Sequence, residues 1–276
     1  MSEVTNPNAT LSVAILSGKG GVGKTNLALN LSYALFRASH HVLIMDFDVG
    51  LANVDVLLGL SPDKNLQDLF RPDVTAAEVI IPIETGGFDF LPAASGVPEL
   101  LEMDDDMREI LFRKLNNVFA NYDYLTLDLG AGISPTVLSV AAMSHLRVLV
   151  VTPEPTSLTD SYAVIKVLHT QYGIDDFHVL VNQVAKTSEA KTTFERLNAA
   201  CQRFLDIELN FLGGVHTDPA LPDAVRHQVP LLRHAPGCQA AKDILAGAVR
   251  LHRLRQERSA TLRGMPVLGK IPSAQK

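Results

Sequence analysis

The sequence reads Ser17-Gly18-Lys19-Gly20-Gly21-Val22-Gly23-Lys24-Thr25 between an apolar run over 11–16 and a helical pattern over 26–35. Strand, glycine loop and helix in this order form the context that a phosphate-binding loop requires. Because glycine has no Cβ, such a loop can bend tightly and bring its N–H groups against phosphate oxygens. The alternative, a glycine-rich turn that binds nothing, does not account for this spacing after a strand. The stretch therefore predicts a nucleotide phosphate site.

Lys24 and Thr25 fall at the start of the predicted helix, whose N-terminal end carries partial positive charge. The Lys24 ammonium is expected to reach the β- and γ-phosphates, and the Thr25 hydroxyl is expected to be a ligand of Mg²⁺. The other predicted contacts to the nucleotide in this region are Gly20, Gly21, Val22, Gly23 and Asn26.

Lys19, directly after the first glycine, is not required by an ordinary phosphate loop. The stretch from Lys19 to Thr25 resembles the deviant Walker A motif of the MinD/ParA family of ATPases. The resemblance implies that ATP and Mg²⁺ are the ligands and that two ATP-bound subunits form a homodimer. It also implies that Lys19 reaches the nucleotide of the other subunit. Without the family, Lys19 reads as a solvated loop lysine.

Length, charge and cysteine content limit the classes of function. The chain has 276 residues, 47% of them hydrophobic, which is enough for one α/β domain with a large core. Its net charge of −6 argues against DNA as a partner. Cys201 and Cys238 form no paired motif, which indicates a reduced, cytoplasmic setting and argues against an iron–sulfur carrier. No apolar run approaches the ~20 residues that span a bilayer.

Apolar runs alternate with helical patterns along the rest of the chain. Strands are predicted over 42–45, 88–92, 124–128, 147–152, 178–182 and 211–215, and helices over 105–120, 158–171 and 188–204. This alternation predicts an α/β fold, a single doubly wound, mostly parallel sheet with helices on both faces. The ATPase domain is expected to span 11–256, between a disordered N-terminus over 1–10 and a basic, apolar, flexible tail over 257–276.

Acidic residues follow two of these strands, where ligands of open α/β sheets bind. Asp46 and Asp48 stand at i and i+2, a spacing that suits the positioning of metal and water. Their stretch resembles the switch I region of MinD, which implies that Asp48 orients the attacking water and Asp46 supports Mg²⁺. Asp128 matches the Walker B pattern, which holds Mg²⁺. The alternative is that Asp46 and Asp48 cap a loop and a helix.

Three later residues are assigned through the resemblance. It implies that Glu154 touches the ribose in the partner subunit, although an acid at the start of a helix is the alternative. Asn182 stands where the family places an adenine-reading amide, and its donor and acceptor match the adenine edge. Asp218 is a candidate near the base, in a loop where His216 replaces the family's proline. Leu129 and Gly130 also depart from the family pattern, which bears on the hydrolysis rate.

The resemblance is closest to the FlhG/FleN branch, which regulates the number and placement of bacterial flagella. The stretches that carry it are 48–59, 91–96, 154–166 and 203–206. It implies a slow regulatory ATPase whose partner is an FlhF-type GTPase, a flagellar switch-complex protein or a flagellar transcription activator. A MinD septum-placement protein and a ParA-type partition ATPase are alternatives. A metabolic P-loop ligase or kinase is the alternative from another class.

The end of the chain carries a last amphipathic pattern over 241–256 and then a basic, apolar tail. Such a tail could touch an anionic membrane at the inner face of the cell membrane. Gly264, Pro266, Gly269 and Pro272 would break the amphipathic helix that membrane binding uses. A flexible or partner-binding tail is therefore favoured over a weak membrane contact, and the protein is expected in the cytoplasm.

Overall fold

A computed structural model describes residues 6–47, 54–71, 73–92 and 105–269. Among these residues, eight strands form one sheet in the order β3-β4-β2-β5-β1-β6-β7-β8. Neighbouring strands are parallel except β3 and β4. The strands are β1 (Leu11–Ser17), β2 (Val42–Phe47), β3 (Ile81–Glu84), β4 (Phe88–Pro92), β5 (Tyr124–Ala131), β6 (Leu146–Val151), β7 (Phe177–Val184) and β8 (Asn210–His216). The predicted mostly parallel sheet is confirmed.

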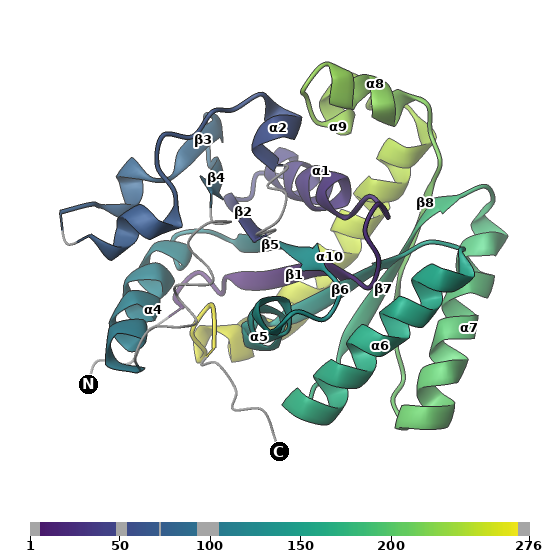
Figure 1. Ribbon diagram of the computed structural model, residues 1–276. Helices are drawn as coiled ribbons and strands as arrows, with labels where there is room; N and C mark the ends of the chain where they lie inside the picture. Colours follow the sequence, from purple (N-terminus) through teal and green to yellow (C-terminus); the bar gives the residue numbers. More distant parts are fainter. Residues whose placement is uncertain (1–5, 48–53, 72, 93–104, 270–276) are drawn as a thin grey trace.

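Helices cover both faces of the sheet (Figure 1). One face carries α1 (Lys24–Arg37), α2 (Val54–Leu58), α8 (Ala220–Arg226), α9 (Leu231–His234) and α10 (Gln239–Arg263). The other carries α4 (Asp105–Phe119), α5 (Pro135–Met143), α6 (Pro155–Tyr172) and α7 (Thr187–Leu205). The 3₁₀ segments Leu66–Phe70 and Ala76–Glu78 connect α2 to the β3 edge.

The alternation of side chains along β1 explains why the run over 13–16 is apolar at every position. Val13 and Ile15 belong to the core under α1 and α10, whereas Ala14 and Leu16 belong to the core under α4–α7. A strand covered on both faces is mostly apolar on both of them. β1 lies between β5 and β6, so its carboxyl end opens where the strand order reverses, which is where such sheets bind ligands.

β3 and α5 are not among the elements predicted from the sequence. β3 is a short antiparallel strand at the edge of the sheet, and Pro82 within it obscures a strand pattern. The sequence does contain a signal for the start of α5. Ser134 caps its first turn by accepting a hydrogen bond from Val137 N, and Pro135 follows at the first helical position.

The prediction of a disordered N-terminus is wrong for residues 6–10. Asn6 and Thr10 are buried, and Thr10 N donates to Asn6 Oδ1 at 2.7 Å. The Thr10 hydroxyl donates to Tyr122 O at 2.6 Å, which fixes the segment on the turn before β5. Polar composition suggested disorder, but these polar groups find backbone partners that the sequence does not reveal.

The prediction of a flexible tail over 257–276 is wrong for residues 257–269. α10 continues to Arg263, and Leu262, Val267 and Leu268 are at most 3% exposed. Leu268 N donates to Asn116 Oδ1 at 2.8 Å, and Gly269 N donates to Met143 O at 2.9 Å. The chain turns after the helix and fills a gap between α4 and α5 with apolar side chains.

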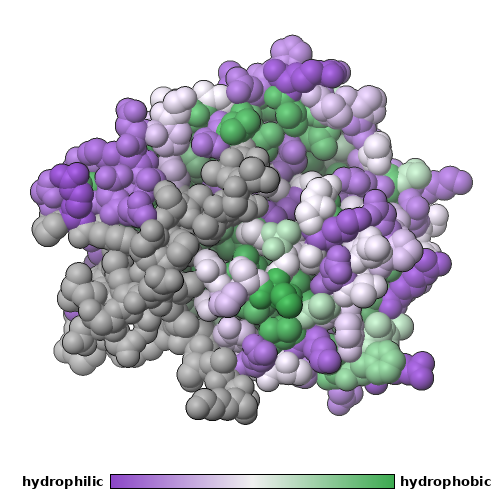
Figure 2. Space-filling view, viewed as in Figure 1, coloured by the Kyte–Doolittle hydropathy of each residue, from purple (hydrophilic) through white to green (hydrophobic). Residues whose placement is uncertain are grey.

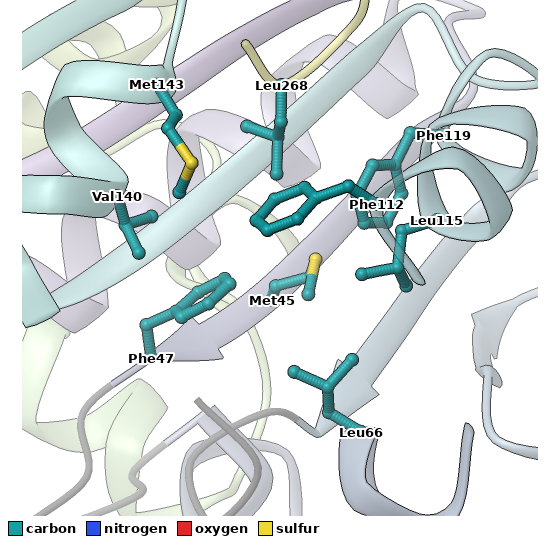
Figure 3. Close-up of a pocket in the computed structure, with 9 residues that line it drawn as sticks. All are labelled: Met45, Phe47, Leu66, Phe112, Leu115, Phe119, Val140, Met143 and Leu268. Carbon is teal, nitrogen blue, oxygen red and sulfur yellow. The ribbon is translucent and has the colours of Figure 1, made fainter. Parts of the chain in front are cut away.

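Leu268 lines a small apolar cavity together with residues from β2, α4 and α5 (Figure 3). The other residues around it are Met45, Phe47, Leu66, Phe112, Leu115, Phe119, Val140 and Met143. The C-terminal segment is thus part of the core beneath β2. None of the helices in the described part of the chain has the length and hydropathy to cross a bilayer.

Candidate functional site

The loop over 18–23 joins the carboxyl end of β1 to α1, as the sequence predicted. Gly21 and Gly23 have φ values of 80° and 86°, a left-handed conformation that residues with a Cβ rarely adopt. A Cβ built on Gly20 or Gly21 would meet nothing within 4 Å, so open space lies beside the loop. No side chain caps the first turn of α1, which leaves its N–H groups available to phosphate oxygens.

Gly18 and Gly23 are needed for packing as well as for bending. A Cβ on Gly18 would lie 2.2 Å from the backbone carbon of Asp160, so the loop sits directly against α6. A Cβ on Gly23 would lie 2.5 Å from Asn182 Nδ2. Sequence reasoning missed this role because it depends on which helix lies beside the loop.

Lys24 and Asp128 form a buried ion pair at the centre of the site. Lys24 Nζ lies 2.7 Å from Asp128 Oδ1, and the two side chains are 7% and 0% exposed. Burial raises the pKa of the Asp128 carboxyl to about 6; the Lys24 ammonium opposes the rise, and the Asp46 carboxylate adds to it. The structure therefore brings together the predicted phosphate-binding lysine and the predicted metal-binding acid.

The donor set at Asp128 fits Mg²⁺. Asp128 Oδ2 is buried without a hydrogen-bond partner among the described residues, although buried polar atoms are normally paired. The Thr25 hydroxyl lies beside this carboxylate and lowers its pKa. Within the described ranges, no three His, Cys, Asp or Glu side chains gather closely enough to hold a metal by themselves. Phosphate oxygens and water would complete the shell, as Mg²⁺ usually requires.

Asp46 lies opposite Asp128 on the neighbouring strand β2. Its Oδ2 accepts a hydrogen bond from Val54 N at 3.0 Å, so it also fixes the start of α2. This contact supports the alternative that Asp46 is a helix-capping acid. Asp46 still lies beside Asp128, the predicted metal ligand. Asp48 lies outside the described residues, and its role in orienting water stays a prediction.

Lys19 and Glu154 contact each other within one subunit. Lys19 Nζ lies 2.5 Å from Glu154 Oε2 and 3.1 Å from Thr156 Oγ1, and both charged side chains are partly exposed. Glu154 stands at the start of α6, immediately before Pro155. The sequence assigned both residues to contacts across a dimer interface. In the single chain each serves as the other's partner.

Asn182 is held against the phosphate loop and is 4% exposed. Its Nδ2 donates to Val22 O at 2.8 Å, which orients the amide and leaves Oδ1 as an acceptor. An acceptor in this position suits the 6-amino group of adenine. Gln183 Nε2 donates to Gly21 O at 3.3 Å, a second tie to the loop that sequence reasoning did not assign.

The carboxylate of Asp218 holds the first turns of two helices. Ala220 N donates to its Oδ1 at 3.0 Å and Ala240 N to its Oδ2 at 3.2 Å, and such backbone donors lower the pKa of Asp218. A contact of Asp218 with the base stays a prediction. His216 is fixed in this loop, because Asp243 Oδ2 accepts from its backbone N and lies 2.7 Å from its Nδ1.

Comparison with known proteins gives concordant matches. A profile of AAA domains matches residues 10–193. The antiactivator FleN of Pseudomonas aeruginosa is 36% identical over 229 residues, which are 83% of this chain and 81% of that protein. The flagellum site-determining protein YlxH of Helicobacter pylori is 34% identical over 84% of this chain and 78% of that protein. The MinC:MinD cell division complex of Aquifex aeolicus superimposes with a TM-score of 0.71 at 27% identity, covering 88% of this chain and 96% of that chain.

Proposed function

We propose, since the chain belongs to the MinD/ParA family of P-loop ATPases, that it is an ATP-dependent dimerisation switch that regulates the number or placement of bacterial flagella. The observation that carries the proposal is the sequence identity to FleN and to YlxH. Each alignment covers more than three quarters of this chain and more than three quarters of the relative. The septum-placement alternative is weaker, since a MinD of Helicobacter pylori is 28% identical.

The phosphate loop, Lys24 and Thr25 bind ATP with Mg²⁺ in this proposal. Lys24 exchanges Asp128 for the β- and γ-phosphates, to which it can donate charge-assisted hydrogen bonds. Thr25, Asp128 and Asp46 would hold Mg²⁺, which neutralises phosphate charge when bound. The Asn182 acceptor selects adenine over guanine, because guanine carries an oxygen where adenine carries the amino group.

The dimer would form when two ATP-bound subunits meet. Lys19 leaves Glu154 and reaches the nucleotide of the other subunit, and Glu154 becomes available to the ribose across the interface. Since the Lys19–Glu154 pair is partly exposed, little free energy opposes its opening. Asp48 positions the water that attacks the γ-phosphate, and hydrolysis dissolves the dimer.

An exposed aromatic surface between α6 and α7 supports action through a protein partner. Phe204 is 65% exposed, and its ring lies edge-on to Tyr162 with centroids 6.5 Å apart. Arg203 lies over the Phe204 ring. Exposed aromatic residues with a neighbouring arginine are enriched in protein interfaces. The proposed partner is an FlhF-type GTPase, a flagellar switch-complex protein or a flagellar transcription activator.

Light scattering after gel filtration with ATP and Mg²⁺ tests the switch. The wild-type protein should dimerise and then return to monomers as ATP is consumed. The Lys19→Ala variant should bind ATP but stay monomeric, whereas Asp48→Ala should persist as a dimer. The proposal fails if both variants stay monomeric while the wild-type protein hydrolyses ATP at a rate per subunit that is independent of protein concentration.

A further inference from the structure

Helix α2 is held at its first and middle residues by side chains from different parts of the fold. At its start, Val54 N donates to Asp46 Oδ2 at 3.0 Å. At its middle residue, Gln228 Nε2 donates to Val56 O at 3.0 Å. Gln228 lies in the turn between α8 and α9, which stand beside α2 at the top of Figure 1. Val56 itself is 61% exposed. Hydrophobic side chains lie at the surface near the top of the molecule, where Figure 1 places α2, α8 and α9 (Figure 2).

The contact between Gln228 and α2 is close and conformationally specific. Gly59, just after α2, has a φ of 64°, and a Cβ there would lie 2.7 Å from Gln228 Oε1. Gln228 also has a positive φ, 53°. This conformation is unfavourable for a residue with a Cβ, and glycine or asparagine would adopt it more readily. A simple turn does not need glutamine here, whereas the contact with Val56 needs its length and its amide.

The hydrogen bonds continue from Gln228 to the metal side of the nucleotide site. The two contacts belong to the same short helix. The Val56 carbonyl accepts from Gln228, and the Val54 amide, two residues earlier in α2, donates to Asp46. Asp46 lies opposite Asp128 in the register of β2 and β5, and its charge raises the pKa of Asp128. A shift of α2 would therefore move the hydrogen-bond donor that orients the Asp46 carboxylate beside the metal position.

We propose that Gln228 is a positioning residue for ATP hydrolysis, acting through α2 on Asp46. The inference rests on the proposed function, since it assumes that Asp46 supports the metal shell. Gln228 lies in the turn between α8 and α9, outside the phosphate loop, so it should affect turnover and leave the affinity for ATP measured without Mg²⁺ unchanged. Such a residue would tie the rate of hydrolysis to the position of the α8–α9 segment.

Two substitutions separate positioning from folding. Gln228→Asn keeps the amide and suits the positive φ, but it is one methylene too short to reach Val56 O. Gln228→Glu keeps the length and loses the N–H donor. Loss of one such hydrogen bond should lower kcat about three- to tenfold at saturating protein and Mg·ATP. The ATP dissociation constant and the dimer fraction should stay within about twofold, and the Tm of Gln228→Asn should be unchanged or higher.

The matched control is Gln256→Asn, which shortens an exposed glutamine on α10 and should leave kcat unchanged. A lysine at position 228 restores an N–H donor, so Gln228→Lys should recover most of the turnover. The inference is overturned if Gln228→Asn and Gln228→Glu both hydrolyse ATP at the wild-type rate. It is also overturned if ATP affinity, dimerisation or Tm falls together with kcat. A wild-type rate no higher than that of Lys24→Ala would instead refute the proposed function itself.

Discussion

The ammonium of Lys24 lies 2.7 Å from the buried carboxylate of Asp128, so the lysine predicted to bind phosphate is paired with the acid predicted to bind Mg²⁺. Two opposite charges inside the protein are thereby neutralised. Entry of Mg·ATP must replace this pair with a lysine–phosphate and a carboxylate–metal contact. The pair explains why both charged groups can be buried in this part of the site.

Replacing Lys24 with alanine should destabilise the protein as well as abolish tight ATP binding. The substitution leaves the Asp128 carboxylate buried without its cation, which typically costs about 3–5 kcal/mol. The double variant Lys24→Met/Asp128→Leu should recover most of that stability but none of the ATP affinity. Thermal unfolding and nucleotide titration measure the two effects. A single variant as stable as the wild-type protein would show that the pair is not buried in solution.

Binding of Mg·ADP should release protons near pH 6. The pKa of Asp128 is raised from 3.8 to about 6. As the pH falls from about 6 towards 3.8, the folded protein therefore binds a proton that the unfolded chain does not, and its stability relative to the unfolded chain increases. Metal binding requires the carboxylate, so roughly half a proton per site should be released at pH 6 and almost none at pH 8. Calorimetry in buffers of different ionisation enthalpy, corrected for ADP alone, measures this. Equal release at both pH values would contradict the assignment.

Substitution of Asn182 should reduce the preference for ATP over GTP. Asn182→Ala removes the acceptor that the Val22 carbonyl orients, and loss of one such hydrogen bond should reduce the ratio of affinities about three- to tenfold. The control is Gln183→Asn, which alters the neighbouring tie to Gly21 and tolerates the positive φ of 58°. Equilibrium titration with labelled nucleotides should show an unchanged ratio for the control. An unchanged ratio of ATP to GTP affinity for Asn182→Ala would show that Asn182 does not recognise the base.

Shortening Leu268 should destabilise the fold, although the sequence suggested a flexible tail there. Leu268 is 3% exposed within the core beneath β2, so Leu268→Ala should cost about 2–5 kcal/mol. Met265 is 42% exposed, and Met265→Ala serves as a matched control with a small effect. Chemical denaturation of both variants provides the comparison. Equal stabilities would mean that residues 264–269 do not pack on the core in solution.

Much of the fold followed from local patterns in the sequence. The glycine loop after 11–16, the apolar runs and the helical spacing predicted a mostly parallel sheet, because each pattern reports the burial of contiguous residues. Asp46 and Asp128 were predicted at the ends of their strands. The structure continues β2 to Phe47 and β5 to Ala131, and the parallel pairing of these two neighbouring strands places Asp46 opposite Asp128. The residue types of the phosphate loop were thus sufficient to predict a nucleotide phosphate site.

The partners of the site's side chains were decided by the tertiary structure alone. Lys24 and Asp128 are 104 positions apart, and they meet because β5 lies beside β1 in the sheet. Gly18 is required because α6 packs against the loop, and Val267 and Leu268 are buried because a gap remains between α4 and α5. Periodicity records whether a residue is buried but not what it is buried against, since that depends on the order in which distant strands and helices pack.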